Sequence, residues 1–181
     1  KGISIFARSI DLRNQSSITS ANLGGKGDAG NIDIKTIGDI SISGSNPQSA
    51  EPTIQNFLKS SIKSNTNGKG NAGKITIDTQ DRGKLLLSNR ATITNGINLK
   101  AIGNSKGISI SAQEIALRNN SSIFSANLGG KGDAGNIDIK TTGNVSLFGE
   151  TTPSIIKPGV RNMNRSFISS QTRGKGNTGK I

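Results

Sequence analysis

Residues 30–42 read GNIDIKTIGDISI, and residues 135–147 repeat the pattern as GNIDIKTTGNVSL. In both stretches an aliphatic residue alternates with a polar one, which is typical of a β-strand with one buried face. β-Branched residues dominate the apolar positions, as strands prefer. A glycine separates the first aliphatic pair from the second in each stretch. The pattern therefore predicts two short strands joined by a turn.

The same unit recurs along the whole chain of 181 residues. Residues 2–44 align with residues 107–149 without a gap, and 32 of the 43 positions are identical. The glycines that open successive units are 28, 43, 34, 28 and 44 residues apart, so the basic period is 28 residues and the longer units carry insertions. The predicted rungs are 2–29, 30–72, 73–106, 107–134 and 135–178, with insertions at 45–59 and 150–166. Proline removes a donor from a sheet, and all four prolines lie in these insertions.

Stacking the five units places like residues above one another. Five columns result, and every member is aliphatic: Ile3, Ile32, Ile75, Ile108 and Ile137; Ile5, Ile34, Ile77, Ile110 and Ile139; Ile10, Ile40, Leu85, Ile115 and Val145; Leu12, Ile42, Leu87, Leu117 and Leu147; Ile18, Ile62, Ile93, Ile123 and Ile168. Three short strands per unit cannot bury their apolar faces alone, but parallel stacking buries them together. We therefore predict an all-β fold, a right-handed parallel β-helix of five rungs. An antiparallel sandwich is the competing fold, and it does not require such columns.

Composition limits the other classes of protein. The hydrophobic content of 30% and the net charge of +12 also fit a disordered chain, but the regular columns favour a folded one. The chain has no Cys and no His, which excludes Ser-His-Asp and Cys-His catalysis and the usual zinc sites. No apolar run approaches the ~18 residues of a membrane helix. The chain begins and stops on strand-like sequence, so we interpret it as an internal fragment of a longer protein.

The units G-N-I-D-I-K-T-x-G-x-[IV]-S-[IL], followed by S-S-I-x-S and G-x-G-x-A-G, resemble the repeats of filamentous-haemagglutinin-like exoproteins, most closely the cyanobacterial type. The resemblance covers the chain apart from the two insertions. It implies a large secreted protein with a β-helical shaft, export by two-partner secretion through an outer-membrane transporter, and adhesion or assembly at the cell surface. The family's N-terminal secretion domain is not represented in this sequence, so the resemblance implies export only through the parent protein.

A lysine within G-K-G recurs at Lys26, Lys69, Lys131 and Lys175. Stacked rungs would align these lysines in a row on one edge. Such a row either protects a solvated edge or contacts a polyanion, with acidic polysaccharide, a cell-surface glycan or lipopolysaccharide as the expected partner. Nucleic acid is a weaker expectation, because the chain offers no Tyr or Trp on which bases could stack.

Two other motifs resemble ligand sites. The stretch GGKGDAG at 24–30 and 129–135 lacks the Ser or Thr of a Walker A loop, and its copies lie too far apart for calcium-binding nonapeptides. We interpret it as a turn and predict no cofactor and no metal. Asp33, Asp78 and Asp138 are predicted to decorate the outer face between core isoleucines, so we predict no catalytic residue. A polysaccharide-degrading β-helix enzyme is the alternative function, and clustered aspartates from adjacent rungs would favour it.

The two insertions differ in sequence while the rungs around them match. Because loops escape the demands of stacking, they can diverge to fit a partner. Five apolar residues in them could pack on the shaft or contact a partner: Phe57, Leu58, Ile155, Ile156 and Met163.

Overall fold

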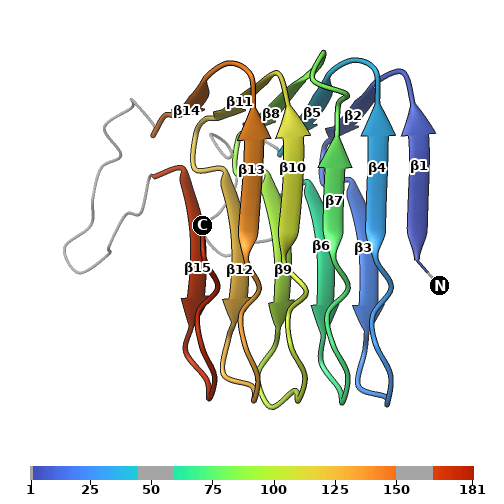
Figure 1. The fold of residues 1–181 in the computed structure, drawn as a ribbon, viewed down its shortest axis with the longest axis vertical. Coiled ribbons are helices and arrows are strands. Elements are labelled where there is room, and N and C mark those ends of the chain that lie inside the picture. The colour runs from blue at the N-terminus through green and yellow to red at the C-terminus, as the bar shows by residue number, and fades with distance from the viewer. Residues whose placement is uncertain (1, 45–58, 150–164) are drawn as a thin grey trace.

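Fifteen strands form three parallel five-stranded sheets in the computed structural model, which describes residues 2–44, 59–149 and 165–181 (Figure 1). The first sheet contains β1 (Ile3–Ala7), β4 (Ile32–Thr36), β7 (Ile75–Asp78), β10 (Ile108–Ala112) and β13 (Ile137–Thr141). The second contains β2 (Ile10–Arg13), β5 (Ile40–Ser43), β8 (Lys84–Ser88), β11 (Glu114–Leu117) and β14 (Val145–Leu147). The third contains β3 (Ser17–Asn22), β6 (Ser61–Thr66), β9 (Thr92–Ile97), β12 (Ser122–Asn127) and β15 (Phe167–Thr172).

Each strand pairs with the corresponding strand of the next rung, which is the connectivity of a parallel β-helix. The register confirms all five predicted aliphatic columns. Ile32 pairs with Ile3 and Ile75, for example, and Leu87 pairs with Ile42 and Leu117. Sixteen members of the columns are buried together with Ala91 and Ala112 in one continuous core.

Burial falls off at the two ends of the stack. Ile3, Ile5, Ile10, Leu12 and Ile18 in the first rung, and Ile139 and Ile168 in the last, are only partly buried. Val145 and Leu147 on β14 are 44% and 48% exposed, so the prediction that every column residue is buried was wrong for these two. The physical reason is that β14 is the edge strand of its sheet among the described residues, and only β11 covers it.

The interior also holds a polar column, which the sequence did not lead us to expect. Ser20, Ser64, Asn95, Ser125 and Ser170 lie in register on the third sheet, two residues after the isoleucine column. Three of these side chains accept a hydrogen bond from the backbone nitrogen of the glycine at which the next rung begins. Gly107 N donates to Asn95 Oδ1 at 2.9 Å, Gly135 N donates to Ser125 Oγ at 2.9 Å, and Gly179 N donates to Ser170 Oγ at 2.8 Å. The column therefore fastens the ends of the third, fourth and fifth rungs to the residues that follow them.

Two threonines near the ends of β4 and β7 are also buried. Thr36 and Thr79 are buried, and their hydroxyls donate to the carbonyls of Gly38 and Gly83 at 2.7 and 2.8 Å. Both threonine side chains therefore face the interior and not the solvent.

Candidate functional site

Five return loops connect the third strand of each rung to the next rung, and together they form one edge of the β-helix. We call this surface the basic edge. It consists of residues 23–31, 67–74, 98–107, 128–136 and 173–180. Neighbouring loops pair in parallel, through bridges that join Lys26 to Lys69, Lys69 to Ile102, Ile102 to Lys131, and Lys131 to Lys175. The predicted alignment of the four lysines is therefore present, and we call these four residues the lysine row.

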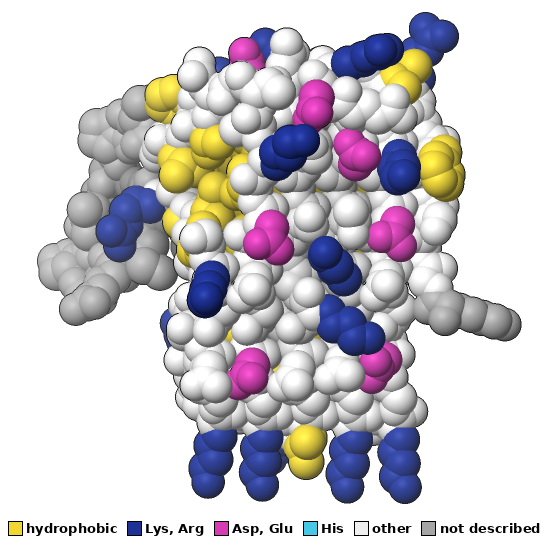
Figure 2. Space-filling view, in the orientation of Figure 1, with side chains coloured by type: hydrophobic (Ala, Val, Ile, Leu, Met, Phe, Trp, Pro, Cys, Tyr) yellow, Lys and Arg dark blue, Asp and Glu magenta, His cyan; other side chains and the backbone are white. Residues whose placement is uncertain are grey.

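The row also contains a residue that the sequence analysis did not assign to it. Ile102 occupies the central position, so the four lysines form two pairs on either side of an aliphatic residue. Figure 2 shows this edge along the bottom of the molecule, where basic side chains project on either side of a hydrophobic one. The sequence signal for Ile102 was weak because the third rung carries NLKAIGN where the other rungs carry G-K-G.

Glycine allows the loops to stack this closely. Gly70 and Gly103 follow the positions of the row, and both have positive φ angles, of 145° and 152°. A Cβ on Gly103 would collide with the carbonyl oxygen of Gly70 in the preceding loop, and a Cβ on Gly70 would collide with that of Gly27. Only glycine satisfies both the backbone angle and the contact. The G-K-G motif therefore forces the lysine side chain outward while the backbone packs.

Asparagine side chains fix the loops that begin with leucine. Asn22 donates from Nδ2 to the carbonyls of Gly25 and Gly27, at 3.0 and 2.6 Å, and accepts from Gly24 N. Asn127 makes the same set of bonds one repeat later, to the carbonyls of Gly130 and Gly132 and from Gly129 N. These bonds reach the carbonyls on both sides of the lysine, so the turn that carries it is held by a buried side chain.

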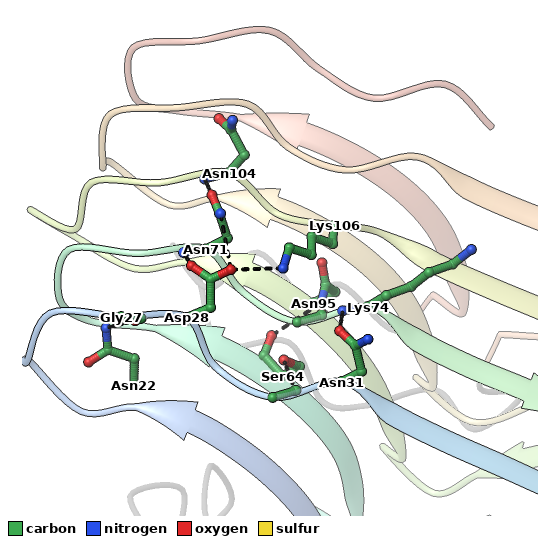
Figure 3. A network of polar contacts seen from close by, with 12 residues as sticks. Asn22, Gly27, Asp28, Asn31, Ser64, Asn71, Lys74, Asn95, Asn104 and Lys106 are labelled. Carbon is green, nitrogen blue, oxygen red and sulfur yellow. Dashed lines mark hydrogen bonds and ion pairs between the residues drawn. The ribbon is translucent and has the colours of Figure 1, made fainter. Parts of the chain in front are cut away.

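A ladder of Asp and Asn side chains follows the lysine row two residues further along each loop, in the order Asp28, Asn71, Asn104, Asp133, Asn177. Each of the first four accepts a hydrogen bond from the backbone nitrogen of the next residue in the ladder, at 2.7–2.9 Å. Figure 3 shows Asp28, Asn71 and Asn104. Asp28 also forms an ion pair of 2.8 Å with Lys106. The bond from Lys106, followed by those from Asn71, lowers the pKa of Asp28 to about 2. Both aspartates of the basic edge are therefore committed to holding neighbouring loops together.

Charge is concentrated on the basic edge. Its 44 residues contain nine Lys or Arg and two Asp, a net charge of +7, whereas the whole chain carries +12. About a quarter of the chain thus carries more than half of its net charge. Among the described residues, the ion pairs use Arg13, Lys84, Lys106 and Lys140 as cations, and the lysine row takes part in none of them.

The aspartates proposed to decorate the outer face do not share one position. Asp33 and Asp138 occupy the same column, with Thr76 and Ser109 between them. Asp78 lies in the neighbouring column, where it pairs with Lys35 and Ser111, so its predicted place between two core isoleucines was wrong. It follows Ile77 as the last residue of β7. The described part of the chain contains no group of three or more acidic residues that could hold a metal ion.

The apolar residues of the insertions, Phe57, Leu58, Ile155, Ile156 and Met163, lie outside the described residues, so their proposed role as partner-binding loops stays a prediction. Within the described ranges, the structure contains no helix long and apolar enough to cross a membrane.

Comparisons with protein-family models, with curated proteins and with solved structures gave no match to this chain. The resemblance to filamentous-haemagglutinin-like exoproteins therefore stays a prediction.

Proposed function

We propose that this chain is a structural shaft segment of a large, secreted or surface-exposed, adhesin-like exoprotein, and that its basic edge attaches the shaft to acidic polysaccharide or to glycans of a cell surface. The observation that carries the proposal is the alignment of the lysine row along one edge of five stacked rungs.

The β-helix supports a role as a scaffold. Three parallel sheets share one aliphatic core, and outward side chains follow the rungs in rows. Parallel strands lie about 4.8 Å apart, so Lys26 and Lys175 are separated by roughly 19 Å along the edge. A linear polyanion lying across the loops would meet successive ammonium groups over that length. Several weak contacts on one chain reinforce one another, because each binding event raises the effective concentration for the next.

The placement of carboxylates favours this function over the alternative of a polysaccharide-degrading enzyme. Glycosidases use two carboxylates about 5–10 Å apart on either side of the scissile bond. Asp33 and Asp138 share a column but are three rung spacings apart, roughly 14 Å. Asp78 lies nearer to Asp33, on the next strand, but it accepts a hydrogen bond of 2.8 Å from Gln80 N. Asp28 and Asp133 on the basic edge are engaged in the ladder of Asp and Asn side chains.

Secretion through an outer-membrane transporter is part of the proposal and is supported by the family resemblance alone. Surface exposure is tested by antibody labelling of intact cells that produce the parent protein. Labelling that requires cell lysis would contradict the proposed location.

Replacing the lysine row by glutamine is expected to weaken binding to dextran sulfate, a sulfated polysaccharide, by about tenfold or more at physiological ionic strength. Exposed charges act on a polyanion over the Debye length of about 8 Å, so wild-type affinity should also fall steeply with added salt. Affinity is measured by isothermal titration calorimetry across a salt series.

The matched control replaces Lys35, Lys63, Lys84 and Lys140 by glutamine, which removes the same charge from strands outside the basic edge. We expect a loss of less than about threefold for this variant. Equal losses in the two variants would show that net charge alone drives binding, and would overturn the assignment of the edge. Absence of wild-type binding would overturn the proposed attachment itself.

A further inference from the structure

The basic edge is also the place where exposed leucines gather. Among the described residues outside the last rung and the final residue, six large apolar side chains are exposed, namely Phe6, Leu23, Ile37, Leu99, Ile102 and Leu128. Four of the six belong to the basic edge: Leu23, Leu99, Ile102 and Leu128 are 83%, 66%, 44% and 38% exposed. A hydrophilic polyanion would make no apolar contact with these side chains.

The leucines and the row share a fixed spacing. Leu23 precedes Lys26 by three residues, Leu128 precedes Lys131 by three, and Leu99 precedes Ile102 by three. Leu23 and Leu128 directly follow Asn22 and Asn127, the side chains that fix the loops. Each such loop therefore presents an apolar side chain at its start and the row residue at its tip.

Between the first three loops lies an open hollow of about 360 Å³. Lys26, Lys69 and Lys100 line it together with Ile102 and the backbone of Gly24 and Gly25. Three lysines and an aliphatic side chain beside one hollow suit a phosphate group that is attached to an apolar body. A polysaccharide supplies the anion and lacks the apolar part, whereas an anionic lipid supplies both.

We propose that the basic edge docks on the surface of an anionic lipid bilayer, with the lysines on the phosphate headgroups and Leu23, Leu99 and Leu128 inserted among the upper acyl carbons. The inference goes beyond the proposed function, since it gives the same edge a second partner of a different class. Charge complementarity selects the partner: the edge carries +7, and a basic side chain near an anionic leaflet strengthens binding by about fivefold. Lysine can extend its apolar stem along the lipid while its ammonium group stays at the headgroups.

The test compares two probes on the same chain: vesicles of phosphatidylcholine with about one third phosphatidylglycerol, a composition that carries the required negative surface charge, and dextran sulfate. We expect wild-type protein to sediment with the anionic vesicles and to remain free of pure phosphatidylcholine vesicles. The triple variant Leu23→Ser, Leu99→Ser, Leu128→Ser should bind the anionic vesicles about tenfold or more weaker, because partial burial of three leucines is lost. Its affinity for dextran sulfate should change less than about twofold, because no charge has changed.

The control Phe6→Ser, Ile37→Ser removes exposed apolar residues away from the basic edge and should leave vesicle binding at the wild-type level. All replaced side chains are exposed, and circular dichroism confirms that each variant keeps the β fold. Wild-type vesicle binding by the leucine variant, or binding to dextran sulfate with none to anionic vesicles, would overturn the bilayer inference and leave the proposed function intact. Loss of both interactions in the wild-type chain would overturn both.

Discussion

Ile77→Asp is expected to destabilise the β-helix by about 4 kcal/mol or more, and to lower its melting temperature by about 10 °C or more. Ile77 lies at the centre of the stack, where it pairs with Ile34 and Ile110 and has no exposed surface. An aspartate there buries a carboxylate among aliphatic side chains, and such a charge costs several kcal/mol unless it is paired. The melting temperature is followed by circular dichroism in the β-sheet region.

Thr94→Asp serves as the matched control for this substitution. Thr94 lies on β9 in the same central rung, is partly exposed, and pairs with Lys63 on the outward face. An aspartate at this position remains hydrated and gains an opposite charge beside it, so stability should change by less than about 0.5 kcal/mol. Equal melting temperatures for Ile77→Asp and the wild type would contradict the inward orientation of this column.

The sequence predicted the columns because two constraints agree in every rung. Alternation sets which residues of a strand face inward, and stacking then demands an aliphatic residue at the same place in the next rung. Ile3, Ile32, Ile75, Ile108 and Ile137 satisfy both, and the structure pairs them as expected. Exposure of Val145 was not predictable from the pattern, because it depends on the absence of a covering strand among the described residues rather than on the residue itself.

The basic edge could be predicted only in part: the sequence predicted the lysine row, but not the position of Ile102 or the exposure of the leucines. The G-K-G motif identifies Lys26 and Lys175 in the sequence. The loop of the third rung lacks this motif, so only the pairing of Ile102 with Lys69 and Lys131 in the structure shows which of its residues lies in the row. The sequence analysis did not single out the leucines, because an apolar residue in a loop is ordinarily expected to pack. The structure instead leaves Leu23 and Leu99 mostly exposed.

The burial of the inner polar column could not be predicted from the sequence pattern. Serine two residues after a core isoleucine has the same period as the core, yet serine is usually assigned to a surface or a turn. Asn95 is fully buried here. It accepts from Gly107 N and from the Ser105 hydroxyl, and its Nδ2 donates to the carbonyl of Gly73. Its role follows from three-dimensional contacts between residues 10–22 positions apart, which no local pattern records.

Asn95→Ala is therefore expected to destabilise the β-helix by about 3 kcal/mol or more. The truncated side chain leaves the Gly107 nitrogen and the Gly73 carbonyl without this partner in a buried region, and each unpaired group costs about 1–3 kcal/mol. The Ser105 hydroxyl also loses its bond to Asn95 but keeps the Ser125 hydroxyl as a partner at 2.9 Å. Chemical denaturation monitored by circular dichroism measures the loss, and hydrogen exchange at Gly107 locates it at the junction between the third and fourth rungs.

Asn95→Ser is the control that the chain itself provides, since serine occupies the equivalent position in the four other rungs. A hydroxyl at this position can accept from Gly107 N as Ser125 Oγ accepts from Gly135 N at 2.9 Å. We expect Asn95→Ser to retain at least half of the stability that Asn95→Ala loses. Equal destabilisation by serine and alanine would show that side-chain volume, rather than hydrogen bonding to the start of the next rung, is what the third sheet requires of this column.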